Sequence, residues 1–411
     1  MEHLKSHLRF QEFKDDWGLY SLRDFIAKIE SGWSPVCLNE IGKKGEWGSL
    51  KTTSSSWEGY FPNENKKLPN NLKPRLNIEV VIDDILITRV GPFDRVGVVA
   101  HVNKDWKHLM VSDNMFRLKL KGEIFPAFVP LILGSFNVQI CWKQKIAGLA
   151  SAQVVINQQT IFSTKLTLPS LNEQTKIANF LSSIDEKLNL LKEKKSLLED
   201  FKKGIMQKIF NQEIRFKDDN GNDFAKWEEL IISELTEVIV GGTPSTSKEE
   251  YWNGNIAWLS SGELNNGLVS KARKYITETG LKNSSAKIMK ANTVLLAMTG
   301  ATLGKMGFLT FDSSGNQSIA GFHPNETYDS KFLFYTLLHN KNTILSMAGG
   351  AAQQGINKAA IESLTFSFCC LEEQTKIGNF LSAIDEKINL VSNQIQDTQE
   401  YKKGLLQKMF V

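Results

Sequence analysis

Apolar residues recur at intervals of three and four along two long stretches of the chain, residues 171–210 and 371–410. In each stretch one row of apolar side chains falls seven residues apart, and a companion row lies beside it. This spacing is typical of a helix with a narrow apolar stripe that a second helix covers. Each stretch is therefore predicted to be one helix on the order of 60 Å long, from a rise of about 1.5 Å per residue.

The stripes predict that the two helices pair with each other inside the chain. The alternative is that each helix packs only on its own domain. The residues expected on the paired faces are Ile177, Leu181, Ile184, Leu188, Leu191, Leu198 and Ile205 in the first stretch, and Ile377, Leu381, Ile384, Ile388, Val391, Ile395 and Leu405 in the second.

The two stretches are copies of each other. They align without a gap, and 22 of 40 positions are identical. Shorter echoes precede them, because Trp17 is matched by Trp227 and a glycine turn at 31–35 is matched by one at 241–245. Two long copies indicate a duplicated domain, whereas a solenoid needs many short repeats. We predict a variable domain at 1–168, a helix at 169–212, a second variable domain at 213–368 and a second helix at 369–411.

The variable domains are predicted to have an α+β fold. Short β-branched runs lie between polar, turn-rich loops, which is typical of strands. Residues 81–87 and 294–297 read as matching buried strands, each followed by a glycine loop. Residues 332–338 read as a helix.

Composition places the chain among ordinary globular proteins, with 41% apolar and 23% charged residues. A net charge of +4 permits nucleic acid binding without arguing for it. Four cysteines are too few and too irregularly spaced for a disulfide framework. The sequence has no run of eighteen apolar residues and no apolar signal segment at its start, so we expect a cytoplasmic protein without a membrane span.

No motif in the sequence predicts a catalytic, metal or cofactor site. The glycine loop at 300–305 resembles a phosphate loop, but it is one residue short and Met306 replaces the hydroxyl residue. The six histidines have no metal-ligand spacing. An endonuclease that uses Asp83, Asp84 and Lys107 remains an alternative, and so does a scaffold whose variable domains bind proteins.

Polar loops with interleaved aromatic and basic residues suit contacts with nucleic acid, because hydroxyls bind phosphate and Arg, Asn and Gln can read base edges. The alternative interpretation is that these are solvated residues at strand ends. The candidate DNA-binding residues are Ser34, Lys51, Thr52, Arg89, Arg95, Thr243, Ser245, Ser260, Ser261, Lys305, Asn316 and Gln317.

Both helices carry the motif Glu-Gln-Thr-Lys-Ile-x-Asn-Phe-Leu-Ser-x-Ile-Asp-Glu-Lys, and both end in similar Lys-Lys-Gly segments. With these motifs the chain resembles, over essentially its whole length, the specificity subunit of a type I restriction-modification system. The loops at 241–244 and 258–262 and the segment 84–91 are similar to those of the family's target recognition domains. The chain departs from the pattern at Cys369-Cys370, which replaces Pro169-Ser170, and at Trp33 within the first glycine turn.

The resemblance implies that the variable domains are target recognition domains and that the helices form an antiparallel spacer. Each domain would read one half of an asymmetric, bipartite site in double-stranded DNA. Two methyltransferase subunits and restriction/translocase subunits would dock on this chain. S-adenosylmethionine, ATP and Mg would belong to those partners, and the chain itself would be non-catalytic.

Overall fold

The structure is a computed structural model that describes residues 8–37, 39–146, 153–349 and 355–410. The chain divides into two compact units. Unit 1 comprises Met1–Lys192 and Gln394–Val411, and unit 2 comprises Glu193–Asn393. Each unit combines small sheets and short helices with part of both long helices, so the fold is α+β as predicted.

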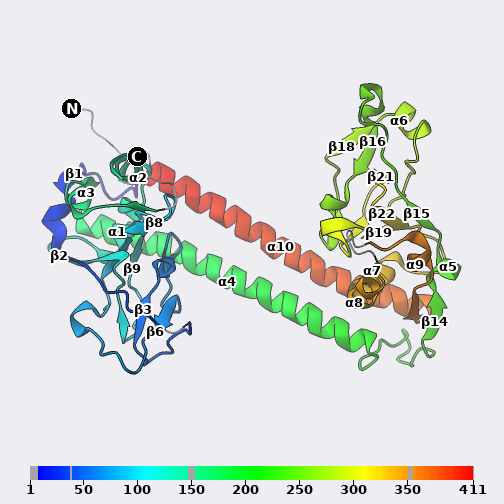
Figure 1. Ribbon diagram of the computed structural model, residues 1–411, viewed down its shortest axis with the longest axis horizontal. Helices are drawn as coiled ribbons and strands as arrows, with labels where there is room; N and C mark the ends of the chain where they lie inside the picture. Colours follow the sequence, from blue (N-terminus) through cyan, green and yellow to red (C-terminus); the bar gives the residue numbers. More distant parts are fainter. Residues whose placement is uncertain (1–7, 38, 147–152, 350–354, 411) are drawn as a thin grey trace. The chain divides into compact units, whose positions relative to one another are not determined.

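The two long helices are α4 (Leu171–Phe210) and α10 (Leu371–Met409), drawn in green and red in Figure 1. The first turn of each is held by an equivalent glutamine. The Gln174 side chain accepts a hydrogen bond from the backbone N–H of Phe125 and donates to the carbonyl of Pro169, both at 3.0 Å. Gln374 does the same with Asp329 and Cys369. Cys369 therefore accepts the same glutamine hydrogen bond as Pro169, while at the first helix the Ser170 hydroxyl also accepts from the Glu173 backbone at 3.4 Å.

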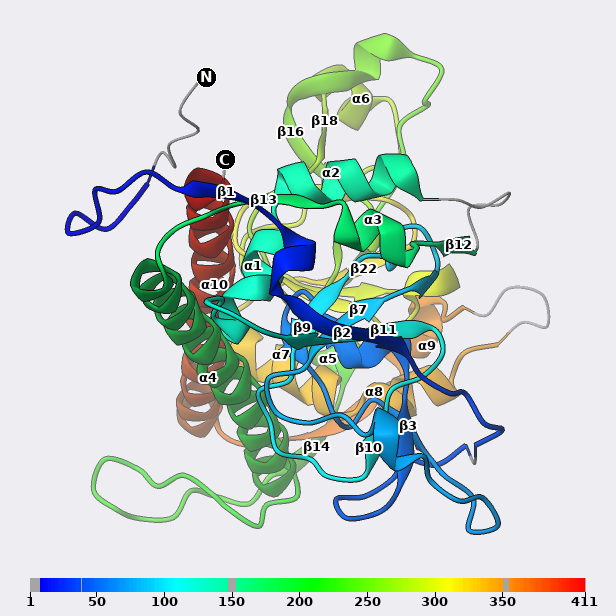
Figure 2. The same ribbon diagram turned by 90° about the vertical axis from the view of Figure 1, so that its left-hand side faces the viewer.

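Unit 1 is built on a four-stranded sheet of order β2-β11-β7-β9, with antiparallel pairing between neighbouring strands. Figure 2 shows this sheet facing the viewer. The strands of the unit are β1 (Gly18–Ser21), β2 (Ile26–Ser31), β3 (Gly48–Leu50), β4 (Ser55–Ser56), β5 (Gly59–Tyr60), β6 (Asn65–Lys67), β7 (Ile85–Thr88), β8 (Val90–Gly91), β9 (Val99–His101), β10 (Leu109–Met110), β11 (Met115–Leu120), β12 (Val154–Val155) and β13 (Lys165–Leu168). Its short helices are α1 (Val129–Leu133), α2 (Phe136–Lys145) and α3 (Gln158–Phe162).

Unit 2 repeats this plan with one added strand, in a sheet of order β15-β22-β19-β20-β17. Its strands are β14 (Glu228–Ile231), β15 (Val238–Val240), β16 (Trp252–Leu259), β17 (Gly267–Val269), β18 (Lys274–Ile276), β19 (Val294–Ala297), β20 (Met306–Leu309), β21 (Ser314–Gly315), β22 (Ile319–Phe322) and β23 (Thr365–Phe368). Its short helices are α5 (Ile232–Leu235), α6 (Glu278–Lys282), α7 (Ser330–His339), α8 (Lys341–Ser346) and α9 (Lys358–Glu362). The predicted helix at 332–338 lies within α7.

Smaller sheets match between the units as well. In unit 1, β3 pairs in parallel with β10, and in unit 2 β16 pairs in parallel with β21. Antiparallel pairs join β1 to β13 and β14 to β23, directly before the long helices. The duplication seen in the helices therefore extends through the strand framework of both domains.

One sequence prediction is wrong in detail. The strand expected at 81–87 begins only at Ile85, because Val81 to Asp84 form a turn in which Val81 and Ile82 are exposed. Asp83 adopts a φ of 68°, a left-handed conformation that ends any continuous strand. Apolar residues flank the aspartate pair on both sides, Val81 and Ile82 before it and Ile85 to Ile87 after it, which gave the appearance of a longer strand.

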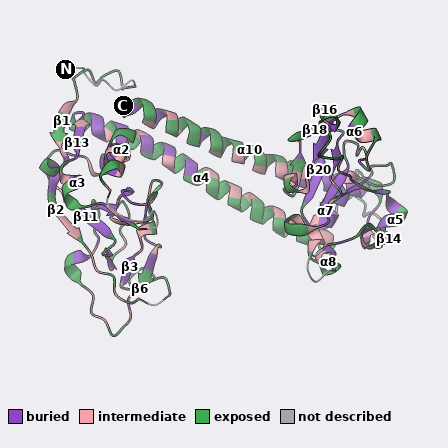
Figure 3. Cartoon of the chain, turned by 45° about the horizontal axis from the view of Figure 1, so that its top comes forward, coloured by how far each residue is buried: buried purple, intermediate pink, exposed green. Residues whose placement is uncertain are grey.

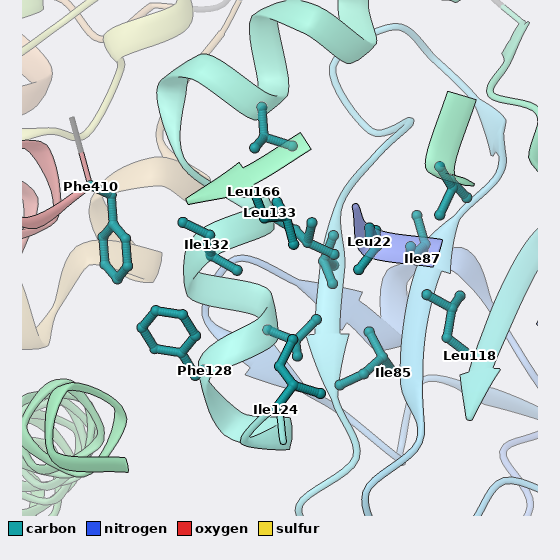
Figure 4. Packing of buried hydrophobic residues seen from close by; sticks show 14 of the residues in the cluster. Leu22, Ile85, Ile87, Leu118, Ile124, Phe128, Ile132, Leu133, Leu166 and Phe410 are labelled. Carbon is teal, nitrogen blue, oxygen red and sulfur yellow. The ribbon is translucent and has the colours of Figure 1, made fainter. Parts of the chain in front are cut away.

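The core of unit 1 joins the sheet, the short helices and the long helices. Figure 4 shows Ile85 and Ile87 of β7 near Leu22, and Phe128 and Ile132 near Phe410. The Phe128 and Phe410 ring centroids are 5.6 Å apart. Figure 3 shows buried residues gathered in the sheets of each unit.

Unit 2 has an equivalent core. Phe210 at the end of α4 packs on Phe332 of α7, again with ring centroids 5.6 Å apart. Phe410 belongs to the second copy of the repeat but packs on the first domain. Phe210 belongs to the first copy but packs on the second domain. Each domain core is therefore completed by the end of the helix that belongs to the other copy.

Equivalent ion pairs join the two long helices in each unit. In unit 1 Lys402 donates to Asp185 at 2.5 Å, and in unit 2 Lys202 donates to Asp385 at 2.6 and 2.7 Å. As the residue number rises along α4, the number of its partner on α10 falls, so the helices pair in an antiparallel sense. In unit 2 the Tyr335 hydroxyl also donates to Asp385, at 2.7 Å.

A buried glutamate anchors the start of each domain to its own helix. Arg9 forms two hydrogen bonds with Glu173, at 2.9 and 2.7 Å, and Arg215 forms two with Glu373, at 3.2 and 2.6 Å. The Trp227 indole also donates to Glu373, at 3.2 Å. Hydrogen bonding to Glu373 raises the pKa of Arg215.

Within the described ranges, no helix combines the length and apolar content needed to cross a membrane.

We expect Glu373→Ala to destabilise the protein by about 3 kcal/mol, because removing one partner of a buried pair leaves the other partner's charge uncompensated. The Glu373 side chain has 0% exposure. Its removal takes away the ion-pair partner of Arg215 and the hydrogen-bond acceptor of the Trp227 indole. Urea unfolding of the purified chain measures the change. The matched control is Glu372→Ala, whose side chain is 56% exposed and which should cost less than about 0.5 kcal/mol. Equal losses for the two variants would contradict the anchor.

Candidate functional site

The candidate residues of unit 2 come from four loops that meet at one edge of its sheets. The loops follow β15, follow β16, join β19 to β20 and precede β22. Backbone hydrogen bonds tie them together: Gly242 donates to Gly315 at 2.8 Å, Asn316 to Leu259 at 2.9 Å, and Met298 to Ser318 at 2.8 Å. Residues far apart in sequence are therefore held in one cluster, which we call loop cluster 2 (residues 241–245, 260–263, 298–305 and 316–318).

Hydroxyl and amide side chains connect these loops directly. Thr243 donates to the Gln317 amide oxygen at 2.5 Å, and Thr302 donates to Ser261 at 3.0 Å. Ser245 is exposed and contacts Ser247, 2.9 Å away. The Asn316 side chain accepts from the Ser318 backbone at 3.2 Å. The structure thus brings most of the candidate residues of unit 2 together.

Lys305 is exposed at the end of the loop between β19 and β20. Within the part of the chain that the structure describes, its side chain forms no ion pair or hydrogen bond. Its ammonium group is therefore available to an external anion.

Two tryptophans of β16 hold the backbone of the first loop of the cluster, residues 241–245. The Trp258 indole donates to the Gly242 carbonyl at 3.0 Å, and the Trp252 indole donates to the Ser245 carbonyl at 3.1 Å. The two rings pack edge to face, with centroids 5.1 Å apart. Hydrogen bonds from two mutually packed rings fix the loop backbone, which leaves the side chains of Thr243 and Ser245 as its outer groups.

In unit 1 the equivalent cluster, loop cluster 1 (residues 32–35, 51–55, 89–97 and 112–114), carries different side chains. The Ser34 hydroxyl bonds to the Asp113 carboxylate, and Arg89 donates to the Asp113 carbonyl at 3.1 Å. The Arg89 guanidinium lies 5.3 Å from the ring centroid of Phe116. Ser34 with Asp113 occupies the place that Thr243 with Gln317 occupies in unit 2.

Arg95 links the glycine loop of unit 1 to the segment after β3. It donates to the carbonyls of Thr52 and Ser55, at 3.0 and 2.7 Å. Lys51 lies 3.6 Å from Glu64. The hydrogen bond from Thr53, together with the Lys51 charge, lowers the pKa of Glu64. Lys51 and Arg95 are therefore partly engaged within the domain, unlike Lys305.

The sequence prediction missed Asp113, Trp258 and Glu263. The Glu263 carboxylate accepts from the backbone and hydroxyl of Ser260, at 2.9 and 3.1 Å. Its position three residues after a serine is the capping-box spacing, so this partner was detectable. No local signal marks Asp113, because it meets Ser34 only through the pairing of β2 with β11.

Asp83 and Asp84, the carboxylates of the endonuclease alternative, lie in different surroundings. Asp84 is buried and accepts from the Val81 backbone at 2.9 Å, whereas Asp83 is exposed and contacts His101 at 2.8 Å. Burial raises the pKa of Asp84. Among the residues that the structure describes, no group of three or more His, Cys, Asp or Glu side chains could hold a metal ion.

The loop that resembles a phosphate loop leads into a strand. Residues Gly300–Thr302 form a single 3-10 turn, and β20 follows at Met306. A phosphate loop instead precedes a helix whose N-terminal amides hold the phosphate.

The predicted helix-pairing residues all lie on covered faces, to different degrees. Ile177, Leu181, Ile184, Leu188, Ile377, Leu381, Ile384, Val391 and Leu405 are buried, while Leu191, Leu198, Ile205, Ile388 and Ile395 are half-buried. Several of them also pack on domain residues, but the end of each helix lies in the core of the other copy's domain. The alternative in which each helix packs only on its own domain is therefore wrong, and ion pairs join α4 to α10.

Comparison with known proteins agrees with this architecture. Residues 30–200 and 225–399 each match the type I restriction modification DNA specificity domain. A putative type I restriction enzyme MjaX specificity subunit from Methanocaldococcus jannaschii is 27% identical, over 96% of this chain and 93% of that protein. The EcoEI specificity subunit from Escherichia coli is 34% identical, over 44% of this chain and 31% of its own length.

The fold is also similar to that of a solved structure. The crystal structure of the S subunit of a type I restriction-modification system from M. genitalium matches with a TM-score of 0.65 and 14% identity, over 99% of both chains. Two matched domains, repeated strand frameworks and two long helices define a specificity subunit. The chain belongs to the family of type I restriction-modification DNA specificity proteins.

Gly241→Ala should destabilise unit 2 by about 2 kcal/mol, since overpacking forces the backbone apart. A Cβ at Gly241 would overlap the carbonyl oxygens of Gly315 and Asn316. Gly262→Ala, in the neighbouring loop, is the control, because its Cβ would meet only the Ser260 hydroxyl at 3.8 Å. Thermal unfolding measures stability, and amide exchange of residues 241–245 measures loop order. If Gly241→Ala matched the control in both readouts, the conclusion that Gly241 packs closely against residues 315–316 would be wrong.

Proposed function

We propose that this chain is the DNA-reading subunit of a type I restriction-modification complex and reads an asymmetric, bipartite site. Loop clusters 1 and 2 are the reading surfaces, one for each half of the site. The observation that carries the proposal is one strand framework built twice, with different side chains in its loops.

The side chains of the two clusters have the chemistry that base recognition requires. In the major groove each base pair presents its own pattern of donors and acceptors, which Arg, Lys, Asn and Gln can read in pairs of hydrogen bonds. Loop cluster 1 offers Arg89 and Arg95, and loop cluster 2 offers Asn316, Gln317 and Lys305. Because these sets differ, the two half-sites differ.

The paired helices support a spacer role. Their antiparallel register is set by the ion pairs Lys402–Asp185 and Lys202–Asp385, so a helix cannot shift by one turn without losing both. One heptad adds about 10 Å to a helix, and neighbouring base pairs are about 3.4 Å apart. Helix length is therefore a natural determinant of the spacing between half-sites.

Partner subunits would supply the chemistry. The relatives are named as specificity subunits of restriction enzymes, and a structure with a similar fold comes from work on complex assembly of a type I system. On the long helices Leu190, Leu197 and Leu390 are 59%, 62% and 62% exposed, and each is an apolar side chain that a partner subunit would cover. Two methyltransferase subunits would bind S-adenosylmethionine and methylate adenine at N6. Restriction subunits would use ATP and Mg, so that this chain holds no cofactor and is not catalytic.

Exchange of residues 213–368 for the corresponding domain of another specificity subunit should change one half-site and leave the other half unchanged. The reason is that loop cluster 2 lies wholly inside this segment. Methylome sequencing of cells that carry the hybrid with its methyltransferase gives both half-sites directly. The reciprocal exchange of residues 1–168 is the control, and a change in both halves from either exchange would show that the domains do not read independently.

Duplication of one heptad in α4 and of the equivalent heptad in α10 should lengthen the spacer by about three base pairs, at about 10 Å per heptad. Methylome sequencing reads the new spacer, while both half-sequences should stay the same. A variant with alanines at the exposed positions of the same heptads controls for altered surface chemistry. An unchanged spacer in an active, lengthened complex would refute the role of the helices as a ruler.

A further inference from the structure

A dense run of positive charge lies beside loop cluster 2 and has no assigned role. Residues 271–290 contain six basic side chains, Lys271, Arg273, Lys274, Lys282, Lys287 and Lys290, and one acidic residue, Glu278. All six basic residues are exposed. Lys290 pairs with Asp312 at 2.8 Å, but within the described ranges the other five form no ion pair.

Lys274 is placed next to the first loop of the cluster by strand register. It lies opposite Trp258 in the antiparallel pair of β16 with β18, so the two side chains share one face. Its ammonium group is 5.6 Å from the ring centroid of Trp252. Trp258 and Trp252 are the residues whose indoles hold the backbone of residues 242–245, so Lys274 borders that loop.

Arg273 is placed next to the second loop by Glu263. One carboxylate oxygen of Glu263 accepts from Ser260, while the other accepts from the Arg273 backbone N–H at 3.0 Å. The carboxylate thus joins the loop after β16 to the start of β18. The Arg273 guanidinium itself forms no hydrogen bond with any described residue.

We propose that Arg273 and Lys274 bind the DNA phosphate backbone that flanks the half-site read by loop cluster 2. This inference rests on the proposed function. It assigns Arg273 and Lys274 to the phosphate backbone and leaves the base edges to loop cluster 2. Unpaired, exposed cations match a polyanion with one charge for about every 1.7 Å of duplex. They position the duplex without reading its sequence, because phosphates are the same at every step.

Lysines also lie beside β3, the equivalent strand of unit 1, and two of them form ion pairs. Beside β3, Lys51 lies 3.6 Å from Glu64 and Lys67 lies 2.8 Å from Glu46. Their charge is offset within the domain. Lys66, which lies opposite Ser49 in the pairing of β3 with β6, is exposed and forms no ion pair within the described ranges. The proposal is therefore placed in unit 2 because of the contacts that Arg273 and Lys274 make beside loop cluster 2.

The test is the salt dependence of binding by the specificity subunit in complex with its methyltransferase. The DNA is the duplex site identified by methylome sequencing, and the variant is R273A/K274A. Each lost phosphate contact lowers the slope of log affinity against log salt by about 0.9. Between 50 and 200 mM salt the parent complex should therefore lose about ten-fold more affinity than the variant. Selectivity over a scrambled duplex at fixed salt should be unchanged.

Two matched variants separate position from net charge. K217A/K226A removes the same charge from the segment that leads into β14, at the opposite end of unit 2 from β16 and β18 (Figure 1), and should keep the parent slope. R273K/K274R keeps both charges and should also keep the parent slope, which shows that the domain folds with altered side chains here.

An unchanged slope in R273A/K274A would overturn the proposal, and so would an equal drop in K217A/K226A. A changed half-site in R273A/K274A would overturn it as well, because it would make these residues readers of sequence. A parent complex that binds every duplex equally would instead refute the proposed function itself.

Discussion

The structure depends on the apolar stripe of each long helix, whose two ends are covered by the two domain cores. In unit 1 the first half of α4 packs on the domain core with Ile177 and Leu181 and is joined by the second half of α10. Unit 2 repeats this with the halves exchanged. The end of each helix completes a core in the other copy's domain, as Phe410 does on Phe128 and Phe210 on Phe332. Neither domain core is therefore complete without a segment from the other copy.

This mutual completion explains which parts of the repeat stay alike and which differ. Residues that anchor a domain to the helices recur in pairs, as Glu173 and Glu373 do with Arg9 and Arg215. Even there the copies have diverged: the Trp227 indole bonds to Glu373, whereas the buried Trp17 indole nitrogen has no partner among the described residues. Residues at the loop edge of the sheets do not join a domain to the helices, and their side chains differ between the two copies, as Ser34 with Asp113 and Thr243 with Gln317 do.

A division of labour follows for unit 2. Two tryptophans fix the backbone of its first loop, and Lys274 lies beside them. Arg273 lies beside the second loop, where its backbone N–H donates to Glu263. Rigid support leaves little side-chain and loop entropy to be lost on binding. Phosphate contacts add affinity that does not depend on sequence, which leaves selectivity to the loops. In unit 1 the equivalent loop is instead held by a hydrogen bond from the Ser34 hydroxyl to the Asp113 carboxylate. The Asp113 carbonyl also accepts from Arg89.

The sequence by itself determined the duplication, the two long helices and the α+β class, because heptad spacing and repeated motifs are local patterns that read directly as structure. Helix α4 begins and ends within two residues of the predicted 169–212. The predicted strand at 81–87 failed because an apolar run does not reveal the left-handed Asp83 that interrupts it. Only the tertiary structure decided which loops meet, that Asp113 joins Ser34, and that Glu263 also accepts from the Arg273 backbone. Those contacts depend on strand order and register, which bring together residues up to about eighty positions apart and leave no trace in local sequence.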